Sequence, residues 1–216
     1  MKNINRRKFI TSSLATAGAL AVQSCTGNKN QEHSLTGKNP IKIADPNQGL
    51  SREEIMLMLD QKVDYYMAQS YHCAQSSFLA LSEQFSLGNK DIVKALTPFP
   101  GLAETGKTCG ALIGSLMVIG LVFGRDRIDD WKKYRESLIP SGDFVTAFEN
   151  KEGSTNCAEI VEKEFGKRYN LRDPAEQQEF VAAGATEKCG KVVKNAVHMA
   201  AGIILDYYKV SDSGTH

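Results

Sequence analysis

Residues 111–124, with the sequence ALIGSLMVIGLVFG, constrain the fold of this chain more than any other segment. The run is apolar all round, yet it is shorter than the roughly 20 residues that a membrane-spanning helix needs. A helix without a polar face has to be covered by other elements of the protein. We therefore predict a buried central helix inside a bundle of further helices, rather than a membrane span.

The other segments carry the periodicity of amphipathic helices. Residues 51–69 begin with Ser51 and Glu54 at capping-box spacing and place apolar residues on one face. Further helices are expected at residues 73–86, 109–124, 128–139, 143–150, 156–166, 174–183 and 188–208. Turn-forming sequences separate them, namely SLGNK, TPFPG, IPSGD, KEGS, NLRDP and AAGAT. Because no stretch alternates with period two for long, the predicted class is all-α, a compact multi-helix bundle over residues 51–210 with a disordered tail at 211–216.

The composition indicates an ordinary globular domain and argues against a nucleic-acid partner. The 216 residues include 26 Lys and Arg against 25 Asp and Glu, for a net charge of +1, and 42% are hydrophobic. A chain of this length and composition can bury a sizeable core. Because the two signs are mixed along the chain, no basic stripe is available for a phosphate backbone, and no nucleic-acid partner is expected.

The N-terminal residues are interpreted as a targeting segment outside the fold. In residues 1–25, Arg6 and Arg7 precede a mildly apolar run of small residues, a pattern that resembles a twin-arginine export signal. The sequence AVQSC resembles a lipoprotein cleavage box, with Cys25 as the lipidated residue. Residues 26–50 are polar and rich in Gly, Asn and Lys, which is typical of a flexible linker. These patterns predict an exported protein, periplasmic or membrane-anchored in the cell envelope.

Four cysteines remain after Cys25, and each follows a residue that can cap a helix. The pairs of cap and cysteine are Ser70 and Cys73, Thr108 and Cys109, Asn156 and Cys157, and Thr186 and Cys189. All four cysteines are therefore predicted at helix N-termini, where unpaired amides and the positive end of the dipole favour the thiolate. Lys107, Lys188 and Lys191 add positive charge beside two of them, and His72 does so when it is protonated.

Thiolates at these positions permit several kinds of site. They can bind a metal, attack a disulfide or hold an electron-carrying cluster. Their spacings of 36, 48 and 32 residues contain no C-x-x-C pair, which disfavours a zinc ribbon and a bacterial ferredoxin loop. The alternatives are thiol–disulfide chemistry or a disulfide-stapled binding domain, a structural zinc domain, and unconnected buried cysteines.

The sequence GLAETGKT, residues 101–108, also satisfies the spacing of a phosphate-binding loop. Such a loop follows a buried strand, whereas the preceding DIVKALTPFP contains two prolines and is a poor strand. We interpret Gly106 and Thr108 instead as the turn and cap that start the helix at Cys109. Nucleotide binding is not expected.

Four segments, each with one cysteine, carry a family resemblance. They are YHCAQSSFLALSEQFSL, GLAETGKTCGALIGSLMVIGLVFG, STNCAEIVEKEFG and EKCGKVVKNAVHMAAGIIL. They resemble the C_GCAxxG_C_C family of redox-active proteins, and the resemblance extends over residues 51–208. Its most specific part is CGALIG, where Cys109, Gly110, Ala111 and Gly114 carry the CGAxxG signature. Gly110 and Gly114 are four residues apart, so a neighbouring backbone or cluster can approach closely.

The resemblance implies a compact helical domain with one redox site. That site would be an iron–sulfur cluster held by Cys73, Cys109, Cys157 and Cys189, with Gly110 and Gly114 beside it; zinc or no cofactor are the alternatives. The implied role is an electron-transfer component rather than a stand-alone enzyme. Its partner would be another redox protein, met at a membrane surface through the lipid anchor, and a homodimer is a further option. Two inserts, IPSGDFVTAFENKEGS and NLRDPAEQQEFVAAGATE, depart from the family pattern.

Three more residues receive an interpretation. No second histidine shares the spacing of His198, which we interpret as a surface or hydrogen-bonded histidine. Glu104 is interpreted as an exposed loop carboxylate, with proton acceptance during reduction as the alternative. Trp131 is expected on the inward face of an amphipathic helix.

Overall fold

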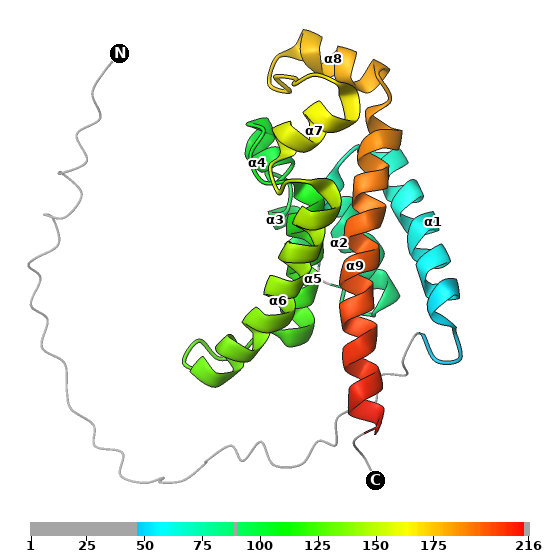
Figure 1. Ribbon diagram of the computed structural model, residues 1–216, viewed down its shortest axis with the longest axis vertical. Coiled ribbons are helices and arrows are strands. Elements are labelled where there is room, and N and C mark those ends of the chain that lie inside the picture. The colour runs from blue at the N-terminus through cyan, green and yellow to red at the C-terminus, as the bar shows by residue number, and fades with distance from the viewer. Residues whose placement is uncertain (1–46, 89, 214–216) are drawn as a thin grey trace, which may run out of the picture. The chain divides into compact units, whose positions relative to one another are not determined.

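A computed structural model describes residues 47–88 and 90–213 (Figure 1). This part of the chain contains nine helices and no strand, which confirms the all-α class. The helices are α1 (Arg52–Ser70), α2 (Cys73–Gln84), α3 (Lys90–Ala95), α4 (Gly101–Glu104), α5 (Gly110–Phe123), α6 (Trp131–Glu152), α7 (Cys157–Phe165), α8 (Pro174–Ala182) and α9 (Ala185–Ser213). The predicted targeting segment, Cys25 and the linker up to residue 46 lie outside the described residues.

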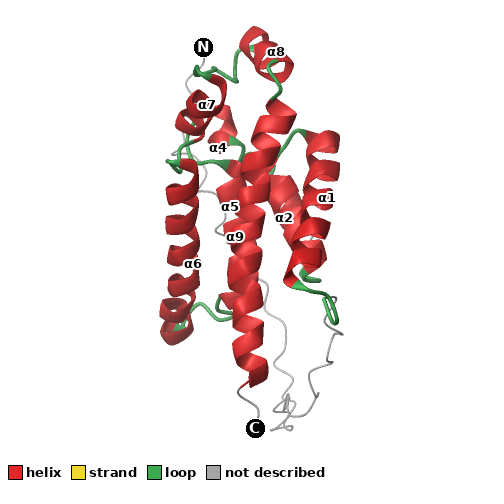
Figure 2. Cartoon of the chain, turned by 45° about the vertical axis from the view of Figure 1, so that its right-hand side comes forward, coloured by secondary structure: helices red, strands yellow, loops and turns green. Residues whose placement is uncertain are grey.

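The apolar segment forms the central helix of the bundle, as predicted. Helix α5 packs against α2, α6 and α9, and α1 closes the bundle by contacting α2 and α9 (Figure 2). Ala111, Val118 and Ile119 of α5 are fully buried, while Leu121 near its end is 42% exposed. Among the described helices, none combines the length and the apolar character that crossing a membrane requires.

Helix α6 is longer than the sequence predicts. It runs without a break through IPSGD, which was expected to be a turn, and contains Pro140. Its packing explains the difference. Phe144 and Phe148, beyond the proline, are fully buried and belong to the hydrophobic core that α1, α2, α5 and α9 also form. Burying two phenyl rings outweighs the cost of the proline, about 3 kcal/mol. Trp131 is 67% exposed rather than inward, and the Arg125 guanidinium lies 5.4 Å from its ring centroid.

The ends of the domain also differ from the predicted boundaries. Asn47 belongs to the predicted linker, yet it is buried and its side-chain oxygen accepts a hydrogen bond of 2.7 Å from Gln84. Helix α9 begins at Ala185, directly after Gly184 with φ +88°, and continues to Ser213. Residues 192–204 of α9 carry its buried apolar face, which packs against α1, α2, α5 and α6.

Candidate functional site

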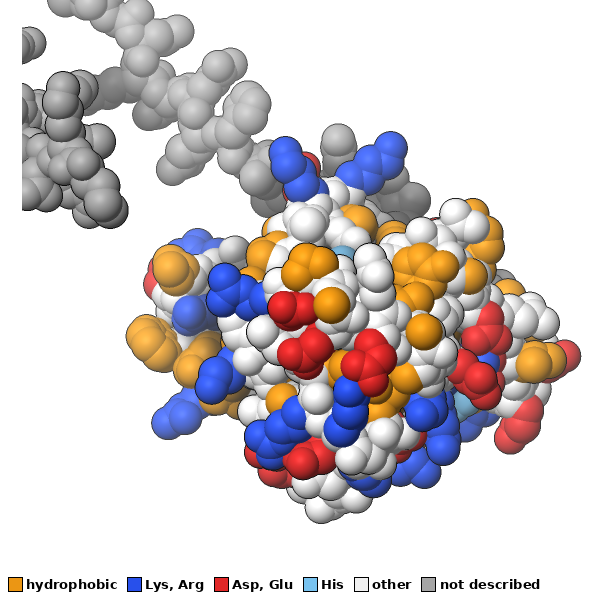
Figure 3. Space-filling model, turned by 90° about the horizontal axis from the view of Figure 1, so that it is seen from above, with side chains coloured by type: hydrophobic (Ala, Val, Ile, Leu, Met, Phe, Trp, Pro, Cys, Tyr) orange, Lys and Arg blue, Asp and Glu red, His pale blue; other side chains and the backbone are white. Residues whose placement is uncertain are grey.

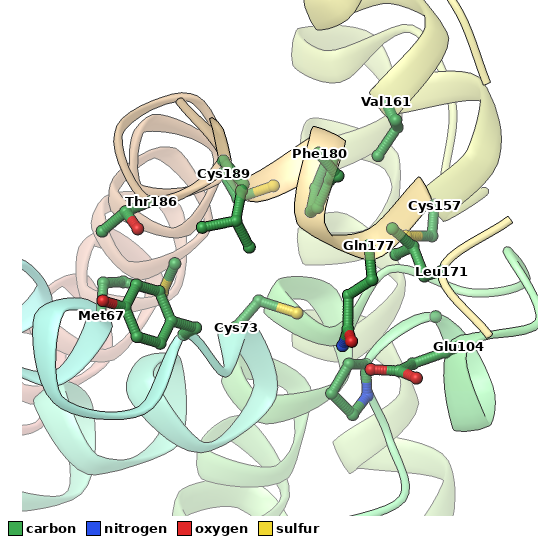
Figure 4. Close-up of a pocket in the computed structure, with 15 residues that line it drawn as sticks. Met67, Cys73, Glu104, Cys157, Val161, Leu171, Gln177, Phe180, Thr186 and Cys189 are labelled. Atoms are coloured by element: carbon green, nitrogen blue, oxygen red, sulfur yellow. The ribbon is translucent and has the colours of Figure 1, made fainter. Parts of the chain in front are cut away.

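The four cysteines of the described chain meet at one end of the bundle, beside α7, α8 and the start of α9 (Figure 1). Cys73, Cys157 and Cys189 line a cavity of about 110 Å³. In Figure 4 the thiols of Cys73 and Cys157 reach into it from opposite sides. Cys109 does not line the cavity and is only 6% exposed, but its thiol interacts electrostatically with those of Cys73, Cys157 and Cys189. Four residues that are far apart in the sequence therefore form one group of thiols.

Cys73 is the first residue of α2, as predicted, although its cap is His72 and not Ser70. The Nδ1 atom of His72 accepts a hydrogen bond of 3.1 Å from the amide of Gln75. Its Nε2 atom lies 3.0 Å from the carbonyl oxygen of Thr97 and must donate the proton. Both ring nitrogens thus have hydrogen-bond partners, and His72 serves as the cap of α2.

Cys109 and Cys157 are held together by a short antiparallel pairing of backbone. The amide of Cys109 donates to Thr155 at 2.9 Å, and the amide of Cys157 donates to Lys107 at 2.6 Å. Asn156 caps α7 as predicted, because its side-chain oxygen accepts from the amide of Ala158 at 3.0 Å. The N-cap of α5 is Cys109 itself, so the prediction that Thr108 caps this helix is wrong.

Cys189 is not in the first turn of its helix. Helix α9 begins at Ala185, so Cys189 is its fifth residue, and Thr186 lies inside the helix instead of capping it. The left-handed conformation of Gly184 lets the chain turn from α8 directly into α9, which moves the helix start upstream. Cys189 faces the cavity from the second turn and depends on the packing of α9 for its position.

The structure reverses the predicted direction of the thiol pKa values. Burial, with a smaller contribution from a neighbouring thiol, raises the pKa of Cys73, Cys109 and Cys157 to about 12 each. The pKa of Cys189 is also raised well above its usual value by burial and by the other three thiols. Backbone amides lower the pKa of Cys73 and Cys109, as helix starts should, but this effect is smaller than burial. The thiols without a bound cation are therefore protonated at neutral pH.

The lysines do not supply the charge that their sequence positions suggest. Lys107 and Lys191 are exposed, and the Lys188 amine lies 4.4 Å from the centre of the Phe165 ring. The first two amides of α7, those of Cys157 and Ala158, are also not free, because they donate to the carbonyls of Lys107 and Gly106. Together these contacts explain why burial decides the pKa values.

Gly110 and Gly114 allow α2 to cross α5 at very short range, as predicted for a neighbouring backbone. A Cβ atom at Gly110 would overlap the Sγ of Cys73, and one at Gly114 would overlap the carbonyl oxygen of Ala74. The two glycines of the CGAxxG signature thus place the start of α2, with Cys73, directly against the start of α5. That these two glycines contact a cofactor remains a prediction.

The segment that resembles a phosphate-binding loop forms a left-handed turn. No strand precedes it in the described chain, and Gly101, Leu102, Ala103 and Glu104 all have φ between +49° and +59°. Glu104 is partly buried and lines the cavity, so its interpretation as an exposed loop carboxylate is wrong. A Cβ atom at Gly101 would lie 3.1 Å from the Sγ of Cys157, which explains the glycine at this point.

The far wall of the cavity comes from residues that sequence reasoning missed. Helix α8 contributes Gln177, Phe180 and Val181, and Phe180 packs at 4.8 Å on the ring of Phe165. These residues lie in an insert without a motif, so only the packing reveals them. Figure 3 views this end of the molecule and shows apolar side chains among charges of both signs. The Nε2 atom of His198 lies 2.7 Å from a carboxylate oxygen of Asp60, but this contact does not have the geometry of the expected hydrogen bond.

In the described residues, an all-α fold brings four cysteine thiols together beside one pocket. The sequence matches the model of one family, described as "Putative redox-active protein (C_GCAxxG_C_C)", over residues 71–203. The match covers more than half of the chain and includes all four cysteines, so the chain belongs to the C_GCAxxG_C_C family and the resemblance is confirmed. Comparison with curated proteins and with solved structures gave no match.

Proposed function

We propose that Cys73, Cys109, Cys157 and Cys189 hold an iron–sulfur cluster and that the protein is an electron-transfer component rather than a stand-alone enzyme. The observation that carries this proposal is the meeting of four thiols at one end of the bundle, three of them lining one small cavity and the thiol of Cys109 interacting with them. Four cysteine thiolates are the usual donor set for such clusters. The family description, a redox-active protein, agrees with this chemistry.

The spread of the thiols favours a cluster over a single zinc ion. Four sulfur atoms that bind one zinc converge to about 2.3 Å from a common centre. Within the described residues, no three Cys, His, Asp or Glu side chains form a group that could hold one metal ion. Three thiols instead stand around a cavity of about 110 Å³, which suits a group larger than one ion.

The surrounding residues fit an anionic sulfur cluster. Backbone amides of Gly110 and Ala111 point at the thiols of Cys73 and Cys109, where they would stabilise negative sulfur. The apolar wall of Met67, Phe180 and Val181 limits access of water. Because the free thiols have raised pKa values, binding must release their protons to solvent as the metal replaces them. The cluster would supply one-electron transfer, and the chain would supply ligands, amide donors and a mostly apolar cavity.

The N-terminal sequence supports a location outside the cytoplasm. The Arg6–Arg7 pattern resembles a signal of the twin-arginine route, which carries proteins already folded around a cofactor. Cys25, if lipidated, would tether the domain to a membrane surface through the linker that follows it. We propose that the partner is a second redox protein at that surface.

The test is anaerobic purification of the full chain, followed by visible absorption and analysis of iron, zinc and sulfide on one sample. Broad visible absorbance with matching iron and sulfide is the expected result. A colourless protein with one zinc and no iron would show a structural zinc domain instead. A colourless, metal-free protein whose mass rises by two hydrogens per bridge on reduction would show a disulfide protein.

A further inference from the structure

Glu152, the last residue of α6, is the only charged residue among the buried residues of the described chain, with 4% of its surface exposed. None of the ion pairs formed by the described lysines, arginines and histidines includes it. Burying a carboxylate without a cation costs stability unless other interactions compensate. A glutamate at the end of a helix could turn to solvent, so its inward position requires an explanation.

The side chain of Glu152 connects two parts of the four-cysteine pocket. Its Oε1 atom accepts a hydrogen bond of 2.9 Å from the side-chain amide of Asn195, which lies on α9 beyond Cys189. Three residues after Glu152, the carbonyl of Thr155 accepts from the amide of Cys109. The Glu152–Asn195 bond therefore fixes the helix that carries Cys189 against the segment that pairs Cys109 with Cys157.

A second contact keeps the backbone of Glu152 in place. The amine of Lys163 on α7 donates a hydrogen bond of 2.9 Å to its carbonyl oxygen. The hydrogen bond of Lys163 is thus made to the backbone of Glu152 and not to its carboxylate. Glu152 is also close to Cys109 along the backbone, because Thr155, three residues later, accepts the hydrogen bond from the amide of Cys109. Burial is the main reason that the pKa of Cys109 is raised, and the Glu152 carboxylate makes the smallest contribution in the same direction, which agrees with this arrangement.

We propose that Glu152 is a positioning residue of the four-cysteine site and that its buried negative charge holds the reduction potential of that site low. This inference rests on the proposed function. Adding an electron beside a fixed negative charge is unfavourable, and in a partly dry site the charge is poorly screened. Removing it should shift the reduction equilibrium by about tenfold, and tenfold corresponds to 59 mV for one electron.

The experiment is a spectroelectrochemical titration of the full chain as wild type, E152Q and E149Q. Glutamine keeps the acceptor for Asn195 and the size of the side chain, so E152Q removes only the charge. Glu149 lies one turn earlier on α6 and is exposed, which makes E149Q the matched control. The expected result is a potential raised by about 59 mV in E152Q and unchanged in E149Q. Equal potentials in the two variants would overturn the proposal.

Two additions keep the test decisive. If E152Q does not fold, N195K supplies a cation to the intact carboxylate and should raise the potential in the same direction. If the wild-type chain holds no cluster, the proposed function fails by itself. Alkylation of the cysteines in the metal-free variants then tests Glu152: faster modification of Cys109 in E152Q than in E149Q supports its electrostatic role, and equal rates overturn it.

Discussion

The amide of Cys109 and the carbonyl of Thr155 form a hydrogen bond of 2.9 Å that joins two cysteine segments far apart in the sequence. Residues 106–109 and 155–158 pair around this bond, so the start of α5 and the start of α7 move as one unit. The close packing of α2 against Gly110 places Cys73 next to these two segments. Only Cys189, on α9, reaches the cavity from a separately packed helix.

Replacing any one of the four pocket cysteines with serine should abolish the cluster. Cys73→Ser, Cys109→Ser, Cys157→Ser and Cys189→Ser each remove one thiolate from a set of four, and serine is a poor ligand for iron. Visible absorbance and bound iron are the measurements, with Cys25→Ser as the control that should keep both. Normal iron content in all four variants would contradict the assignment of the ligands.

Gly114→Ala should destabilise the protein by about 1–3 kcal/mol or more, because the new methyl group would force α2 away from α5. The matched control is Gly120→Ala on the same helix, where a Cβ atom meets nothing within 4 Å. That change should stabilise the protein by up to about 1 kcal/mol through helix propensity. Urea unfolding of both variants gives the two free energies. Equal stabilities would show that the CGAxxG glycine is not needed for helix packing.

The bundle was predictable because its signals are local. The apolar run of α5, the capping box at Ser51 and the cap at Asn156 each determine nearby structure, and the structure confirms them. The long α6 was missed since a proline and a glycine indicate a turn, while the burial of Phe144 and Phe148 depends on distant helices. Local propensity cannot show which contacts the rest of the fold will supply.

The four-cysteine site was also predictable only in part. The four cysteines were recognised from their segments, but the state of their thiols was predicted wrongly, because helix dipoles can be read from sequence and burial cannot. Nothing in the sequence indicates that Glu152 is buried, because a glutamate at a helix end is usually solvated. Its inward position depends on Asn195, which is 43 residues away in the sequence.

Without a bound cofactor, the protein should lose stability as the pH rises above about 9. An ordinary thiol has a pKa of 9.0, and burial raises that of Cys157 to about 12. Between these values the unfolded chain releases a proton that the folded chain retains, so the free energy of unfolding falls with pH and is unaffected by this group below pH 9. Unfolding midpoints between pH 7 and pH 11 measure the slope. Cys157→Ser should have a shallower slope than Cys25→Ser, and identical slopes would contradict a buried, protonated thiol.

The left-handed turn of residues 101–104, which lies beside Cys157, should respond in opposite ways to two small substitutions. Ala103→Gly removes the cost of a left-handed alanine, about 1–2 kcal/mol. Glycine also raises the entropy of the unfolded chain, which lowers stability by about 0.5–1 kcal/mol. Because Ala103 is exposed, the net effect should be a stabilisation of roughly 0.5–1 kcal/mol.

Gly101→Ala, in contrast, adds a methyl group at φ +49°, where its Cβ would lie 3.1 Å from the Sγ of Cys157. It should destabilise the turn and displace that thiol, so iron loss on exposure to a chelator should be faster than in wild type. Urea unfolding and the rate of iron release measure the two effects. If Gly101→Ala releases iron at the wild-type rate, the turn does not hold Cys157 in place, and the strain of the three left-handed residues after Gly101 would need another cause.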